Sequence, residues 1–374
     1  MLTVAHSVRT DKRSRCKNGI LHSLINALKS LSMIQRFLTI LFALILTYAL
    51  PAAAQEKSAV FSLPVDCVIG TDCWIVNYTD VDPSAKVRDY TCGTRSYNDH
   101  KGTDFAIRDY LAMQTGVNVL AAADGKVLRL RDGVDDWPPV KSDTYEQERK
   151  DILDKKLGCG NGVFIEHEGG YTGIYCHLKK DSITVKRGQD IKRGDILGQI
   201  GFSGFTEFPH LHFGLFKDSQ IIDPFTSATA TDGCDMPRNR LWDQTIPHDD
   251  ENIVSFFGGG FKTTAPDFDA LGIDASSPDK IAIDSDIISF WVGLYGVRQN
   301  DVIEMDIRDP NGEIYVSRAI TQPSDKVRQY YFIGKKTRNH PLLAGSYKAA
   351  VTVTRTDKNG YVQQDHFNIS TIVE

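Results

Sequence analysis

The sequence lacks the closely spaced Cys-x-x-Cys pairs that hold zinc in many structural zinc sites. It also lacks a basic body: residues 1–54 hold seven lysines and arginines and one acid, which leaves a formal charge of −11 on residues 55–374. Nucleic-acid binding depends on clustered basic side chains, so this charge argues against a nucleic-acid partner. Long apolar runs are missing as well. The run from Phe37 to Leu50 is shorter than the roughly 20 residues of a transmembrane helix.

The apolar run belongs to a predicted secretory signal peptide within residues 1–54. Met33-Ile34-Gln35-Arg36 precedes it, and Pro51 and three alanines follow it. This pattern predicts cleavage after Ala54. Because a signal peptide starts close to its basic region, we expect translation to begin at Met33 and residues 1–32 to be a spurious extension. An uncleaved membrane anchor is the alternative. Cleavage would leave no stable membrane span, and we expect a periplasmic protein.

The exported part keeps an even number of cysteines, which in an oxidising compartment predicts disulfide bonds. These are Cys67, Cys73, Cys92, Cys159, Cys176 and Cys234. Six cysteines allow fifteen pairings, and the sequence alone does not choose between them. Two pairs are favoured, because Cys67 and Cys73 close a short loop and Cys159 and Cys176 flank a predicted hairpin. Cys92 is then left with Cys234.

Short strands separated by glycines follow one another between residues 119 and 216. A near repeat over residues 185–198 places Gly188 and Gly194 after pairs of basic residues, where a tight turn needs positive φ. This pattern predicts a compact antiparallel β domain over residues 55–245, with its core at 99–224. The segment Ser142–Leu157 breaks the pattern, since it is charged and has no glycine. We expect an inserted helix or a flap over the β core, although such charge runs are often just solvated faces.

A second β pattern occupies the C-terminal third of the chain. Residues 247–280 contain several prolines and three consecutive glycines, which indicates a linker or an irregular entry segment. From Ile281 onward, about six or seven alternating strands predict an immunoglobulin-like β-sandwich, so residues 246–374 are expected to form a linker and a sandwich domain. His340 and His366 lie there alone, and we interpret them as surface residues.

The candidate site residues are histidines and one aspartate in the first β domain. His210 and His212 lie two residues apart in an extended segment, so their side chains project to the same face. His100 and Asp104 are spaced as on a helix turn, but the Gly-Thr between them favours a loop that leads into a strand at Phe105–Ile107. Two imidazoles and a carboxylate suit a zinc ion with one position left open. His177 follows another predicted strand and is free to handle protons.

Five blocks in this order resemble the lysostaphin-type zinc metallopeptidases, which cleave peptide cross-links in bacterial cell walls. The blocks are HKGTD (100–104), GCGNGVFIEH (158–167), YCHL (175–178), the glycine-paired repeat (185–198) and PHLHFGL (209–215). The resemblance covers roughly residues 99–224. It implies that His100, Asp104 and His212 bind Zn²⁺ and that His177 and His210 flank the water that attacks the substrate.

The resemblance predicts a zinc-dependent endopeptidase that acts on the peptide stems of peptidoglycan. An envelope regulatory protein is a candidate partner. The main alternative is a non-catalytic wall-binding module that activates another hydrolase, although degenerate members of the family lose ligands and this chain keeps all five positions. A further alternative is a secreted protease that cleaves proteins, which would use the same chemistry at the zinc ion. The segment Ser203–Phe208 departs from the family's small polar loop, because it holds two aromatic residues and an acid. His167 lies outside the motifs and is interpreted as structural.

Overall fold

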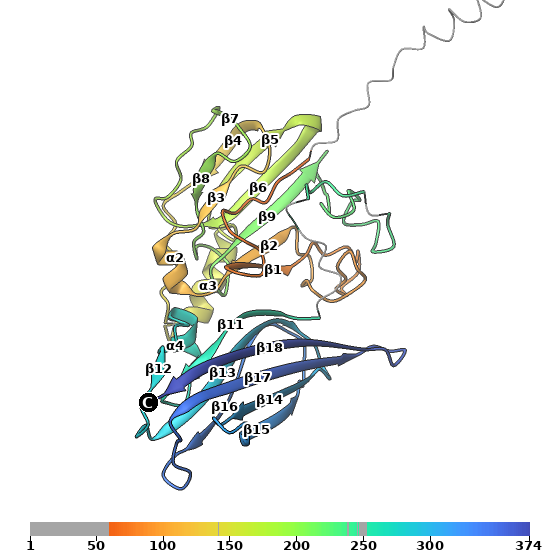
Figure 1. Cartoon of the computed structure of the whole chain (residues 1–374). Coiled ribbons are helices and arrows are strands. Elements are labelled where there is room, and N and C mark those ends of the chain that lie inside the picture. The colour runs from red at the N-terminus through yellow and green to blue at the C-terminus, as the bar shows by residue number, and fades with distance from the viewer. Residues whose placement is uncertain (1–59, 141, 238, 245, 247–252) are drawn as a thin grey trace, which may run out of the picture. The chain divides into compact units, whose positions relative to one another are not determined.

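The computed structural model describes residues 60–140, 142–237, 239–244, 246 and 253–374. All of these residues belong to one compact unit, Ser58–Glu374 (Figure 1). The predicted signal peptide, its cleavage site and the predicted start at Met33 lie outside the described residues. Among the described helices, none is both long and apolar enough to cross a membrane.

The first half of the described chain is built on an eight-stranded sheet with the strand order β1-β2-β9-β6-β5-β4-β7, and β10 pairs with β9. Every pairing in this sheet is antiparallel, as the short, regularly spaced strands predict. The strands are β1 (Cys73–Asn77), β2 (Thr103–Ile107), β4 (Gly125–Arg131), β5 (Asn161–His167), β6 (Tyr171–Leu178), β7 (Asp190–Ile191), β9 (His210–Lys217) and β10 (Gln220–Ile221). A separate two-stranded sheet pairs β3 (Asn118–Leu120) with β8 (Ile196–Gln199). The helix α2 (Tyr110–Thr115) lies between β2 and β3 in the sequence.

Strand β9 shows how the sequence divides the two faces of this sheet. Leu211, Phe213 and Leu215 are at most 1% exposed and belong to the hydrophobic core. Successive side chains of a strand point to opposite faces. The apolar residues therefore fix the strand on the core, and they direct His210 and His212 to the other face together.

The connections of the first sheet behave as the sequence predicts. Gly188 and Gly194 have φ angles of 80° and 84°, so both repeats turn at a glycine in the left-handed region. The charged insertion contains the helix α3 (Tyr145–Asp154), which is shorter than the predicted segment 142–157. Its buried residue Tyr145 packs edge to face on Trp137, with ring centres 4.9 Å apart.

The C-terminal residues form two facing sheets, and the predicted β-sandwich is confirmed (Figure 1). One sheet has the order β11-β13-β16 and the other β12-β18-β17-β14-β15. The strands are β11 (Ser255–Lys262), β12 (Lys280–Ile281), β13 (Ile287–Val297), β14 (Val302–Arg308), β15 (Ile314–Thr321), β16 (Lys326–Lys336), β17 (Gly345–Thr356) and β18 (Val362–Val373). Alternating residues of both sheets, such as Phe290, Val292, Val351 and Val353, meet in a single core.

The prediction of a linker or irregular segment over residues 247–280 is wrong for its described part. This part contains β11 and the helix α4 (Phe268–Ile273). The three glycines are inside β11, where side chains of other elements approach the backbone closely. A Cβ atom on Gly259 would lie 2.6 Å from the ring of Phe367, and one on Gly260 would lie 1.7 Å from Ser277 Oγ. The glycines therefore allow close packing instead of making a turn.

Aromatic residues of the sandwich pack directly on the first sheet. Trp74 of β1 contacts Phe257 and Tyr295, with ring centres 6.3 and 6.2 Å apart. The hydroxyl of Tyr295 donates to the carbonyl oxygen of Ile107 at 3.3 Å. All five residues of β1 are buried, because this strand is covered on both faces. The same cluster includes Phe208, two residues before His210.

Three disulfides connect the six cysteines that follow the predicted signal peptide, and they are the pairs that the sequence favoured: Cys67–Cys73, Cys92–Cys234 and Cys159–Cys176. Cys159 and Cys176 close the hairpin of β5 and β6. Cys92 lies between β1 and β2, whereas Cys234 follows β10, so the second bond joins segments 142 residues apart.

The long-range disulfide is expected to contribute most to stability. Replacing Cys92 and Cys234 with serine should lower the free energy of unfolding by about 5 kcal/mol, because a loop of this length gains much conformational entropy when the bond is absent. The matched pair of serines at Cys67 and Cys73, which opens a loop of only six residues, should cost about 2 kcal/mol. Urea unfolding of both variants measures the difference. An equal loss in the two variants would contradict the loop-length argument.

Candidate metal centre

Two neighbouring strands and the loop before one of them bring three candidate ligands together. Asp104 on β2 lies directly opposite His212 on β9 in the strand register. Directly opposed residues on antiparallel strands share a face, so strand pairing itself brings the two side chains together. His100 lies in the loop that leads into β2, as expected. The strand begins at Thr103 and not at the predicted Phe105, so Asp104 is held within the sheet.

The three side chains converge on one point. His100 Nε2 lies 3.1 Å from both Asp104 Oδ1 and His212 Nδ1, and the latter two atoms are 2.9 Å apart. The Nδ1–H of His100 donates to the carbonyl oxygen of Tyr78 at 2.7 Å, so Nε2 of the neutral ring carries a lone pair. With the proton of His212 on its Nε2, lone pairs of nitrogen and oxygen face one another at short range, an arrangement that a cation stabilises. Zn²⁺ binds such donors, and the residues fit this metal.

The carboxylate of Asp104 is ionised although it is only 1% exposed. Burial raises the pKa of Asp104, but without a metal the charges that His100 and His210 carry when protonated, and their hydrogen bonds, outweigh this effect and hold its pKa well below the ordinary value. Its second oxygen, Oδ2, accepts a hydrogen bond from Asn77 Nδ2 at 2.9 Å. A buried carboxylate needs such compensation, and a bound cation would add to it.

Two further histidines lie beside the three donors. His177, at the end of β6, has a φ of 64°, a strained conformation for a residue other than glycine. Its Nδ1–H donates to the carbonyl oxygen of Ser203 at 2.8 Å. The Nδ1–H of His210 donates to the carbonyl oxygen of Phe208 at 3.0 Å. The two ring centres are 4.7 Å apart, and Nε2 is the acceptor of each ring when that ring is neutral. His210 Nε2 lies 3.5 Å from Asp104 Oδ1 and donates to it when protonated.

The two histidines differ in proton affinity although their rings are neighbours. Burial, and then the charges of His210 and His212, lower the pKa of His177 well below its ordinary value. Burial also lowers the pKa of His210, but the charge and hydrogen bond of Asp104 outweigh burial and raise it.

A pocket of about 280 Å³ opens onto Asp104 and His210. Its rim includes Phe205 and Glu207, which the sequence singled out as a departure from the family's loop. Helix α3 covers this rim with Arg149, whose Nη1 lies 2.9 Å from Glu207 Oε1 and whose guanidinium lies 4.4 Å from the centre of the Phe205 ring. The insertion therefore forms one wall of the pocket.

Three pocket residues were not predicted from the sequence. Asn77 lies opposite Asp104 in the register of β1 and β2, the ring centre of Tyr97 lies 4.3 Å from that of His100, and Val327 comes from β16 of the sandwich. The only local signal is the polar Asn77 at the end of the apolar run Cys73–Val76. The contacts of the other two depend on folding across the whole chain.

The remaining predicted histidines lie elsewhere. His167 is buried in the core of the first sheet, where its Nδ1–H donates to the carbonyl oxygen of Asp124 at 2.9 Å. His340 and His366 lie in the sandwich, and both are exposed, as predicted. Two other clusters of metal-binding residue types contain disulfide-bonded cysteines, whose sulfur atoms are no longer thiolates.

Residues 98–224 match the family model described as Peptidase family M23. This segment belongs to that family. The match includes all five histidine and aspartate residues of the site, and the resemblance to the lysostaphin-type metallopeptidases is confirmed.

Proteins that are similar to this M23 segment include two named as peptidoglycan DD-endopeptidases. Peptidoglycan DD-endopeptidase ShyB of Vibrio cholerae is 32% identical over 124 residues, which cover 33% of this chain and 22% of that protein. Lysostaphin of Staphylococcus simulans is 37% identical over 76 residues, or 20% of this chain and 14% of that protein. The catalytic domain of lysostaphin from the same species has a solved structure with 24% identity and a TM-score of 0.25, covering 40% of this chain and 85% of that one. The chain spans only 20% to 27% of the length of four curated relatives.

Proposed function

We propose that the protein is a zinc endopeptidase that hydrolyses the peptide cross-links of peptidoglycan in the bacterial periplasm. The observation that carries this proposal is the convergence of His100, Asp104 and His212, with two further histidines beside them. The M23 match supports a metallopeptidase, and the relatives named as peptidoglycan endopeptidases support the substrate class.

Each site residue has a proposed role. His100 Nε2, Asp104 Oδ1 and His212 Nδ1 hold the metal, and the Tyr78 carbonyl and the Asn77 amide orient two of these ligands through hydrogen bonds. A bound zinc ion supplies a Lewis acid that makes water a nucleophile near neutral pH.

His177 and His210 handle the proton and the developing charge. Their Nδ1–H groups are anchored to backbone carbonyls, so each ring is fixed with Nε2 free to accept a proton from water or, once protonated, to donate to the carbonyl oxygen of the scissile bond. The strained backbone of His177 is consistent with a functional constraint on this ring.

The proposed division of the chain follows from the sheets. Residues 55–245 would form the peptidase domain and residues 246–374 the linker and sandwich domain. The sandwich contributes Val327 to the pocket wall, so it would be part of the enzyme and not an independent wall anchor. Export by the predicted signal peptide suits the three disulfides.

Digestion of purified sacculi tests the proposed reaction. Residues 55–374 should convert cross-linked muropeptide dimers into monomers, as measured by mass spectrometry, and a zinc chelator should abolish the conversion until zinc is restored. Unchanged sacculi with folded, zinc-loaded protein would favour the non-catalytic wall-binding alternative. Cleavage of casein instead of sacculi would favour a protease of proteins.

A further inference from the structure

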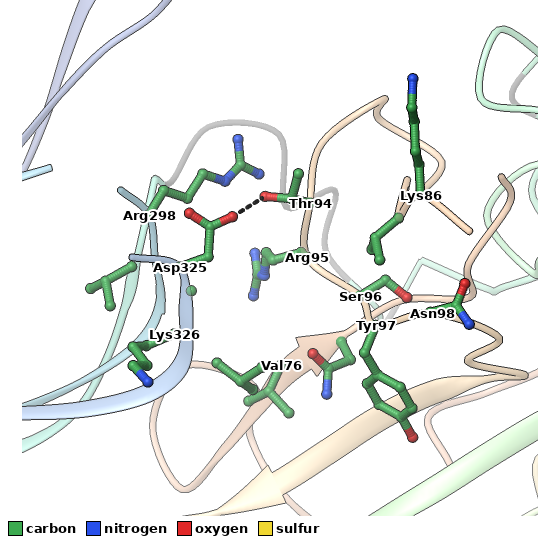
Figure 2. Close-up of a pocket in the computed structure, with 15 residues that line it drawn as sticks. Val76, Lys86, Thr94, Arg95, Ser96, Tyr97, Asn98, Arg298, Asp325 and Lys326 are labelled. Carbon is green, nitrogen blue, oxygen red and sulfur yellow. Dashed lines mark hydrogen bonds between the residues drawn. The ribbon is translucent and has the colours of Figure 1, made fainter. Parts of the chain in front are cut away.

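A second cavity adjoins the catalytic pocket. It has a volume of about 510 Å³ and lies between the segment Thr94–Asn98 and the β13 and β16 ends of the sandwich (Figure 2). Asn77, Tyr97 and Val327 line both this cavity and the catalytic pocket. A ligand in the pocket beside Asp104 can therefore extend past these three residues into the second cavity.

The charge of this cavity is opposite to that of the protein. Its lining contains four basic residues and a single acid; these are Lys86, Arg95, Arg298, Lys326 and Asp325. The exported chain has a formal charge of −11. A basic cavity in an acidic protein concentrates anionic ligands, because the field inside a cleft is focused by its low-dielectric walls.

Arg298 is the basic residue best placed to bind an anion. Its side chain is half-buried, yet within the described part of the chain its guanidinium forms no hydrogen bond or ion pair. Asp325, beside it in Figure 2, is bound to other donors: its Oδ2 accepts from Thr94 Oγ1 at 3.2 Å and its Oδ1 from the backbone N–H of Gln299 at 2.8 Å. Burial, and then the charge of Arg355, lower the pKa of Arg298. The charges of Asp89 and Asp325 offset part of this effect, and an anionic ligand would further stabilise a half-buried guanidinium that has no direct partner.

We propose that this cavity is a substrate subsite in which Arg298 binds a free carboxylate of the peptide, with Lys86 and Lys326 adding to the field. The inference rests on the proposed peptidase function and specifies its substrate as an anionic peptide. Arginine pairs with carboxylates through two parallel hydrogen bonds, so Arg298 sets specificity as well as affinity. Each residue of an extended peptide spans about 3.3–3.6 Å, so a carboxylate a few residues from the scissile bond would reach this position.

The test compares two peptides and two variants. The peptides are one cross-linked muropeptide dimer with free carboxylates and the same dimer with these groups amidated. Arg298→Gln in the zinc-loaded protein should raise KM for the free-carboxylate dimer about 10-fold, as expected for a charge-assisted pair, with kcat and zinc content unchanged. The amidated dimer should be cut with the same KM by both proteins. The control Arg318→Gln removes an equal charge from the exposed face of β15 and should leave KM unchanged for both dimers.

Each outcome decides the proposal. Equal effects of Arg298→Gln on the two peptides, or no effect beyond that of Arg318→Gln, would overturn the subsite. Thermal unfolding checks that Arg298→Gln folds; if it does not, Lys86→Gln on the exposed rim must raise KM selectively for the carboxylate peptide, or the subsite is wrong. If the wild-type protein cuts neither dimer, the proposed peptidase function is wrong, and titration calorimetry tests the subsite separately. Binding of the free-carboxylate dimer that is lost in Arg298→Gln would support the subsite, and binding that does not depend on Arg298 would contradict it.

Discussion

Replacing His212 with alanine is expected to remove both the metal and the activity. Purified residues 55–374 should hold about one zinc per chain, as a site with three protein ligands requires. The variant keeps only His100 and Asp104 as ligands, and its zinc content should fall to the background. Hydrolysis should fall by more than about 100-fold, because changes to residues that merely orient ligands already cost 10- to 100-fold.

Metal analysis and muropeptide release, measured on the same preparation, check the result for His212. The matched control is His366→Ala, which removes a histidine from β18 of the sandwich and should change neither quantity. A His212→Ala protein that is folded and still carries one zinc per chain would remove this residue from the proposed ligand set.

Replacing His177 should separate the chemistry from the metal. We expect activity to fall by about 10²- to 10⁴-fold, the usual contribution of a proton-transferring side chain, while the zinc content stays near one per chain. Asparagine is the better replacement, because it tolerates the positive φ at this position more readily than alanine. The measurement is kcat on the muropeptide dimer together with metal analysis.

Two outcomes would contradict the role of His177. Full turnover of His177→Asn would exclude it from the reaction, and loss of zinc from a folded variant would make it a ligand. His340→Ala, at an exposed position of the sandwich, is the control for histidine removal. Thermal unfolding of each variant shows whether a loss of activity comes from a loss of the fold.

Local sequence patterns were sufficient for the strand that carries two site residues. The alternation of β9 places Leu211 and Phe213 in the core and directs His210 and His212 together to the opposite face, and this follows from a period of two. The partnership of His100 and Asp104 with these histidines depended on the resemblance to a family. Nothing in the spacing alone fixes which strand lies beside β9.

Residues that reach the site through long-range packing could not be predicted. Val327 lines the pocket beside Asp104 only because the sandwich packs on β1, and Arg298 lines the adjoining cavity for the same reason. Glycine signals were also ambiguous. Gly188 makes the predicted turn, whereas Gly259 lies in a strand where Phe367 approaches the backbone, and both look alike in the sequence.

Because Asp104 lies opposite His212 in the strand register, the convergence of the candidate metal ligands depends on the number of residues in β2 and β9. Deleting one residue of β2 ahead of Asp104 would turn its carboxylate toward the core side of the sheet, where Leu211 and Phe213 lie, and would dismantle the site without changing any of its five residues. Insertions are harmless to this geometry only in the connections, which is where the helix-bearing segment 142–157 lies. A change of length in the segment 142–157 would therefore alter the wall of the pocket and leave the register of β2 and β9 unchanged.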